Sequence, residues 1–145
     1  MKLISPAFKH NGAMPFEYTC DGADISPELN IENVPENAKS LALIIDDPDA
    51  PAGTWVHWVV WNIPPDTTKI AKGTESGGIG GKNSWGRIGY GGPCPPSGTH
   101  RYFFKLYALD INLGLKEGSS KQDLEKAMQG HIIEKAELIG HYKRK

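Results

Sequence analysis

The stretch LALIIDDPDAP, residues 41–51, decides how the rest of the chain is arranged. Its first half, residues 41–45, is an uninterrupted apolar run, which predicts a buried β-strand. Its second half brings three carboxylates and two prolines to the end of that strand. Because proline fixes φ and has no N–H to donate, the chain must leave the sheet here in a stiff, charged corner. Such a corner can hold side chains for binding, although Asp-Pro pairs also occur in ordinary solvated turns.

The next strong element is WVHWVVWNI, residues 55–63, which is almost entirely aromatic or β-branched. This composition predicts a central strand covered on both faces. Because side chains alternate along a strand, simple parity would put four side chains on one face: Trp55, His57, Val59 and Trp61. Val56, Trp58 and Val60 would then point to the other face.

Weaker patterns indicate many further strands and one late helix. Short strands are predicted at residues 3–5, 16–19, 29–34, 68–71 and 136–142, and a strong one, HRYFFKLYALD, at residues 100–110. Ser120 is a good N-cap for a helix that repeats Leu124 and Met128 at helical spacing. These elements favour one mainly β domain over residues 1–145, an antiparallel β-sandwich with a C-terminal helix. Residues 73–98 are glycine- and proline-rich, and connections this long are usually functional or disordered. Trp85 and Tyr90 argue against disorder, because disordered segments are poor in aromatic residues.

Composition excludes several classes of function. The formal net charge is -1, with 16 basic and 17 acidic residues, so no electrostatic argument favours nucleic acid. No apolar run approaches the roughly 20 residues of a membrane span, and the first residues are too short an apolar segment for a signal peptide. We therefore expect a cytoplasmic protein. Cys20 and Cys94 match neither a metal motif nor a redox pair, and could form one disulfide or remain free thiols.

Polar side chains from three separate segments could converge at one end of the sheet. Asp47 follows the first strand, His57 lies in the second, and His100 and Tyr102 begin the third. Either histidine alone could be an ordinary buried residue. Together, two imidazoles and a phenol can donate hydrogen bonds to phosphate or carboxylate oxygens. Asp47 could accept a hydrogen bond from one imidazole and so fix its tautomer.

Two other kinds of chemistry use the same residue types. Two histidines and an aspartate can bind zinc or iron, but no His-x-His or His-x-x-x-His spacing supports a metal site. Hydrolysis would need a nucleophile, either Cys94 or Ser97, beside His100. The chain has no Gly-x-Ser-x-Gly elbow that would present such a serine.

Taken in their order along the chain, several short motifs resemble those of the phosphatidylethanolamine-binding protein family, whose members are also called Raf kinase inhibitor-like proteins. The matching stretches are DPDAP at residues 47–51, WVHW at 55–58 and PPSGTHRY at 95–102, and SPEL at 26–29 is similar as well. The compact chain looks like bacterial or archaeal members. The resemblance implies a β-sandwich with Greek-key connections and a small anion-binding cavity at one end.

The resemblance also implies which residues surround that cavity: Asp47, Pro51, Trp55, His57, His100 and Tyr102. We expect Asp49 and Arg101 to form a structural ion pair. The implied function is a non-enzymatic module that binds a small anionic or phosphorylated ligand, without metal or cofactor, and inhibits a kinase or serine protease. A homodimer is implied, whereas nucleic-acid and membrane partners are not expected. The alternatives are a hydrolase or metal-dependent enzyme using the same cluster, and a protease inhibitor acting through residues 73–98.

Overall fold

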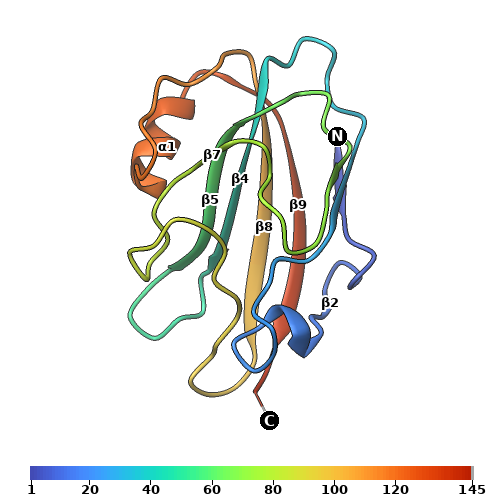
Figure 1. Ribbon diagram of the computed structural model, residues 1–145, viewed down its shortest axis with the longest axis vertical. Helices are drawn as coiled ribbons and strands as arrows, with labels where there is room; N and C mark the ends of the chain where they lie inside the picture. The colour runs from blue at the N-terminus through green and yellow to red at the C-terminus, as the bar shows by residue number, and fades with distance from the viewer. Residues whose placement is uncertain (145) are drawn as a thin grey trace.

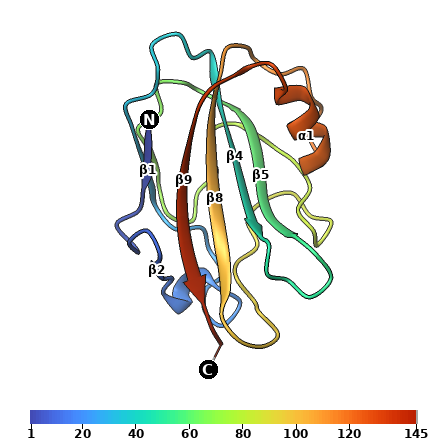
Figure 2. The ribbon, with the colours of Figure 1, turned by 180° about the vertical axis from the view of Figure 1, so that it is seen from behind.

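The computed structural model describes residues 1–144, so Lys145, the last residue of the predicted domain, lies outside the described residues. Two sheets make up the fold. The smaller sheet has the order β1 (Lys2–Ile4), β3 (Leu29–Glu32), β6 (Lys69–Ile70). The larger has the order β2 (Gly12–Ala13), β9 (Ile132–Tyr142), β8 (His100–Leu109), β4 (Ser40–Asp47), β5 (Trp55–Ile63), β7 (Ile79–Gly80). Its four long strands lie side by side in Figures 1 and 2.

Every strand pair is antiparallel except the short parallel pairing of β2 with β9. The helix α1 (Lys121–Met128) lies on the β5 side of the large sheet (Figure 2). Ser120 caps it as predicted, in a capping box with Asp123, and Gly130 follows its end with a φ of 79°. The predicted mainly β class with a late helix is confirmed.

The large sheet is covered on both faces over its middle strands, whereas several residues of β9 are exposed. One face packs against the small sheet through a core that includes Leu29, Ile31, Leu43, Phe104 and Leu106. The other face packs against α1 through Ile44, Trp61, Leu109, Leu124 and Met128. All eight residues of β4 are therefore buried, as its apolar run predicts. Among the described residues, no helix is long and apolar enough to cross a membrane.

A bulge in β5 makes the simple alternation prediction wrong. Ile45 pairs with Trp58 and Asp46 with Val56, so His57 is an extra residue between two pairs. Val56 packs with the core under α1, as do Val59 and Trp61, whereas Trp58 and Val60 belong to the core between the sheets. His57 contacts the ring of Tyr102, which belongs to the core between the two sheets. The bulge thus moves His57 away from the face of Val59 and Trp61.

Other boundaries differ in smaller ways. Residues 16–19, predicted as a strand, form the 3₁₀ helix η1 (Phe16–Tyr18), which starts after Pro15 and closes with a Thr19 N–H bond to the Phe16 carbonyl. The two-residue strands β2 and β7 are too short to leave a pattern in the sequence. Cys20 and Cys94 form a disulfide with a Cα–Cα distance of 5.4 Å, which settles the question that the sequence left open.

Candidate functional site

The three carboxylates at the end of β4 and in the turn after it point in different directions. Asp46 turns to the α1 face, where Lys105 and Lys121 reach its Oδ2 at 3.1 and 2.8 Å. Asp47, only 3% exposed, turns to the opposite face of the sheet end. Its Oδ1 accepts a hydrogen bond from the Asp49 N–H at 2.8 Å, so the stiff Asp-Pro turn and the carboxylate hold each other in place.

Asp47 also positions the first histidine of the site. Its Oδ2 lies 2.7 Å from Nδ1 of His100, and both side chains are buried. Because a carboxylate oxygen accepts, the hydrogen of His100 sits on Nδ1. Nε2 is therefore the nitrogen left for a ligand. When His100 is protonated, Asp47 balances the charge of the imidazolium.

The second histidine has the opposite electrostatic character. His57 Nδ1 donates to the Gly91 carbonyl at 2.7 Å, since a carbonyl can only accept. Burial lowers the pKa of His57 below its ordinary value, more strongly than the Gly91 hydrogen bond and the charge of Asp47 raise it. The neutral ring then carries its hydrogen on Nδ1 and leaves Nε2 bare. That Nε2 is buried and has no partner among the described residues.

Tyr102 supplies a second unpaired polar atom at the same place. Its side chain is 1% exposed, and its hydroxyl has no hydrogen-bond partner within residues 1–144. Burial and the nearby Asp47 charge raise the pKa of the phenol, so the group stays protonated and can donate. The rings of His57 and Tyr102 meet edge to face, with centroids 5.2 Å apart.

These groups surround one cavity of about 250 Å³, which we call the anion cup. Its lining contains all six residues that the sequence predicts there: Asp47, Pro51, Trp55, His57, His100 and Tyr102. They come from the end of β4, the turn between β4 and β5, and the strands β5 and β8. The structure therefore brings together side chains that are up to 55 positions apart, from Asp47 to Tyr102.

Sequence reasoning missed the other part of the wall. Ala50, Trp85, Cys94, Pro95 and Pro96 also line the cup. The Trp85 ring packs edge-on against Trp55 and His57, with centroid distances of 5.4 and 5.2 Å. The only signal for Trp85 was its position as a large aromatic residue inside a glycine-rich segment, which does not say where that segment folds back.

Asp49 and Arg101 lie just outside the cup. The carboxylate accepts from Arg101 Nε and Nη2 at 2.9 and 2.8 Å, and from the Arg101 backbone N–H at 2.9 Å. The hydrogen bonds from Arg101 lower the pKa of Asp49 to about 2. This forked pair ties the turn after β4 to the residue that follows His100, and so supports the geometry of the Asp47–His100 bond.

The alternatives to anion binding receive less support from this geometry. Cys94 is bonded to Cys20, so the proposed thiol nucleophile is not free. Within the part of the chain that the structure describes, no group of three or more His, Cys, Asp or Glu residues is placed to hold a metal ion. Ser97 is exposed and does not line the cup.

The fold and the site together are those of a small β-sandwich protein with a polar cup at one end of its large sheet. The family model for phosphatidylethanolamine-binding protein matches residues 4–143, so the chain belongs to this family of ligand-binding proteins.

Its relatives agree with that assignment. A UPF0098 protein of Methanothermobacter thermautotrophicus is 53% identical over 99% of both chains, and its name assigns no activity. The crystal structure of the family homolog CT736 from Chlamydia trachomatis has a TM-score of 0.97 at 45% identity, covering 99% of this chain and 97% of that one. The structure of YbcL from E. coli has a TM-score of 0.91 at 31% identity, with 99% and 98% coverage.

Proposed function

We propose that the anion cup binds a phosphoryl or carboxylate group and that the protein acts without catalysis. One observation carries the proposal: two buried polar atoms, His57 Nε2 and Tyr102 Oη, have no partner among residues 1–144, and their residues line the same cavity. A buried polar group left unpaired costs about 1–3 kcal/mol. A ligand oxygen would remove that cost for the Tyr102 hydroxyl, and a ligand O–H would do so for the bare His57 Nε2, which gives the cup a reason to be filled.

The three polar side chains would recognise different features of the ligand. The Tyr102 hydroxyl donates to a ligand oxygen, and protonated His100 donates through Nε2 while Asp47 balances its charge. Neutral His57 presents a bare Nε2, which matches a ligand O–H such as that of a protonated phosphate. With a fully ionised ligand, His57 must instead take up a proton.

The size of the cup limits what enters it. A volume of about 250 Å³ lies below the roughly 300–1,000 Å³ of sites for whole drug-sized ligands. Only a small charged group fits, and the remainder of a larger ligand would stay outside, against the rim of Pro51, Trp55 and Trp85. A phosphorylated side chain on another protein meets this description. We therefore propose that the protein regulates a kinase or a protease by binding such a group.

Phosphate titration tests the proposal directly. Adding inorganic phosphate to labelled protein should shift the imidazole NMR signals of His57 and His100. His141 offers a matched control, because it lies on β9 with its side chain in no hydrogen bond among the described residues. We expect His100→Ala to weaken phosphate binding at least about tenfold and His141→Ala to leave it unchanged. If phosphate leaves the His57 and His100 signals unchanged, the anion cup does not have this function.

The enzymatic alternative needs a separate experiment. The purified protein should show no turnover in a screen of phosphate monoesters and carboxylic esters, and no stoichiometric zinc or iron by elemental analysis. Turnover that disappears in His57→Ala would replace the binding proposal with catalysis at the same cluster.

A further inference from the structure

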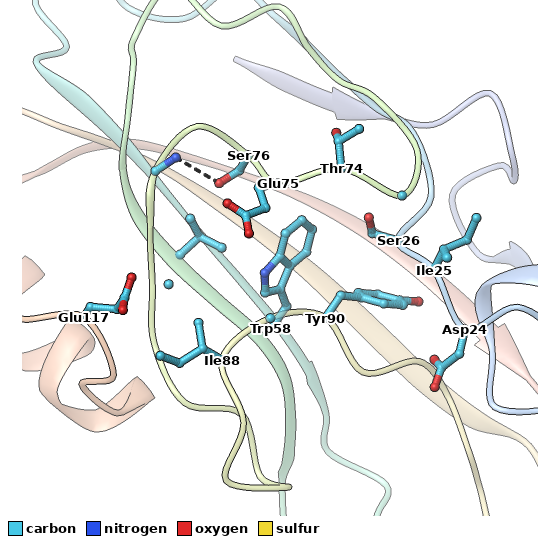
Figure 3. Close-up of a pocket in the computed structure, with 15 residues that line it drawn as sticks. Asp24, Ile25, Ser26, Trp58, Thr74, Glu75, Ser76, Ile88, Tyr90 and Glu117 are labelled. Carbon is cyan, nitrogen blue, oxygen red and sulfur yellow. Dashed lines mark hydrogen bonds between the residues drawn. The ribbon is translucent and has the colours of Figure 1, made fainter.

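A second cavity, of about 300 Å³, lies where residues 73–90 cross the outer part of β5 (Figure 3). It shares no lining residue with the anion cup. Trp58 and Val60 of β5 form one side of it, Ser26 and Gly73 another, and Ile88 to Tyr90 a third. We call this cavity the acidic pocket.

The charged residues that line the acidic pocket all have one sign. Asp24, Glu75 and Glu117 line it, and its lining includes no lysine or arginine. One carboxylate oxygen of Asp24 already has a partner, since its Oδ1 accepts a hydrogen bond from the Gly92 N–H at 2.7 Å. Glu75 and Glu117 form no ion pair or side-chain hydrogen bond within residues 1–144, so both carboxylates remain available to a cation.

The inner wall adds a second, independent feature. Trp58 is 4% exposed, and its indole N–H donates to no described residue. Figure 3 shows the indole nitrogen on the edge of the ring that faces the space between Glu75 and Ile88. The Tyr90 ring packs edge-on against Trp58 at 5.8 Å, which fixes the orientation of the indole. Ser26, also 4% exposed, lines the same cavity with its hydroxyl unpaired among the described residues.

A ligand that satisfies this pocket must combine three properties. It needs a positive charge for the Glu75 and Glu117 carboxylates, an apolar portion for Ile88 and the indole, and an acceptor oxygen for the Trp58 N–H. A cation near an aromatic ring in a partly desolvated site gains a further contribution from the ring quadrupole. Basic amino acids have all three: a charged end, a carbon chain and a carbonyl.

We propose that the acidic pocket binds arginine or lysine, either free or as a residue of a peptide, through the cationic side chain and the carbonyl oxygen. The guanidinium of arginine suits the site best, because its fork of donors can bind one carboxylate at two points while its plane packs on an aromatic or apolar surface. The protein then has two sites of opposite charge preference, one for an oxyanion and one for an organic cation.

The test uses N-acetyl-L-arginine amide, with the citrulline analogue as a neutral probe of the same shape. In ¹⁵N-labelled protein, the arginine probe should shift the Trp58 indole N–H signal with a Kd of about 1 mM or tighter, a typical range for so few contacts. The citrulline probe should bind at least about tenfold more weakly. Free L-arginine, tested in parallel, shows whether the pocket prefers the amino acid or the peptide form.

Variants separate this site from others on the surface. Glu75→Gln with Glu117→Gln should weaken the arginine probe about tenfold or more, and both glutamates are exposed, so the fold should be kept. Glu36→Gln removes an exposed glutamate that does not line the pocket and should change nothing. His100→Ala should also leave arginine binding intact, so failure of the anion cup would not count against this pocket. Equal binding of both probes, no shift at Trp58, or no effect of the double variant would overturn the proposal.

Discussion

The disulfide between Cys20 and Cys94 gives the largest expected effect on stability. Its two cysteines are 74 positions apart, so replacing both by serine frees a long loop in the unfolded chain. With the loop-entropy relation for about 75 residues, the lost stabilisation is about 4.5 kcal/mol at 25 °C. For a chain of this length, the unfolding entropy near the midpoint converts that figure into a fall in Tm of about 15 °C.

Thermal unfolding followed by circular dichroism measures this directly. Wild type with reductant should melt at the same lowered temperature as the Cys20→Ser, Cys94→Ser double variant, because both lack only the cross-link. Phosphate affinity should fall as well, since Cys94 lines the anion cup and anchors the Pro95–Pro96 wall. A Tm within about 3 °C of the oxidised protein would refute the entropy reasoning for this disulfide. It would show that the unfolded chain is already restricted or that the native bond is strained.

Three further predictions concern charged groups at the site. His100→Ala should reduce phosphate affinity, measured by calorimetry, at least about tenfold, because the variant loses one charge-assisted hydrogen bond. Its near-ultraviolet circular dichroism spectrum should stay native, and an unchanged Kd would contradict the role of His100. Phosphate affinity should fall as pH rises from about 5.5 to 8. Burial lowers the pKa of His57 in the free protein and a bound oxyanion raises it, so binding takes up a proton. Binding enthalpies that are the same in buffers of different ionisation enthalpy would argue against that uptake. Asp49→Asn should lower the free energy of unfolding by roughly 1 kcal/mol at pH 7, measured by urea unfolding. The difference from wild type should disappear as pH falls from 3.8 toward 2, where the wild-type carboxyl itself is protonated. A variant as stable as wild type at pH 7 would show that the pair with Arg101 contributes nothing.

Strong local patterns predicted much of the fold. The run over β5 was placed with its correct ends, and Ser120 correctly marked the start of α1. These elements have a long apolar run or a capping residue, so local interactions alone determine them. The 3₁₀ helix at Phe16–Tyr18 was mistaken for a strand because three residues carry too little periodicity to separate the two structures.

The site was predictable in membership but not in orientation. Motif resemblance named the polar residues of the anion cup, yet simple alternation put His57 on the wrong face of β5. The bulge that corrects it depends on pairing with β4, a tertiary contact that the local sequence does not encode. The same reason explains why Trp85 was missed, since only the path of residues 73–98 brings it beside His57.

Crystals soaked in phosphate test the central claim most directly. We predict an ordered phosphate in the anion cup, with oxygens about 2.6–3.2 Å from Tyr102 Oη, His57 Nε2 and His100 Nε2. Phosphate bound elsewhere on the surface, with the cup holding only water at saturating concentration, would contradict the account.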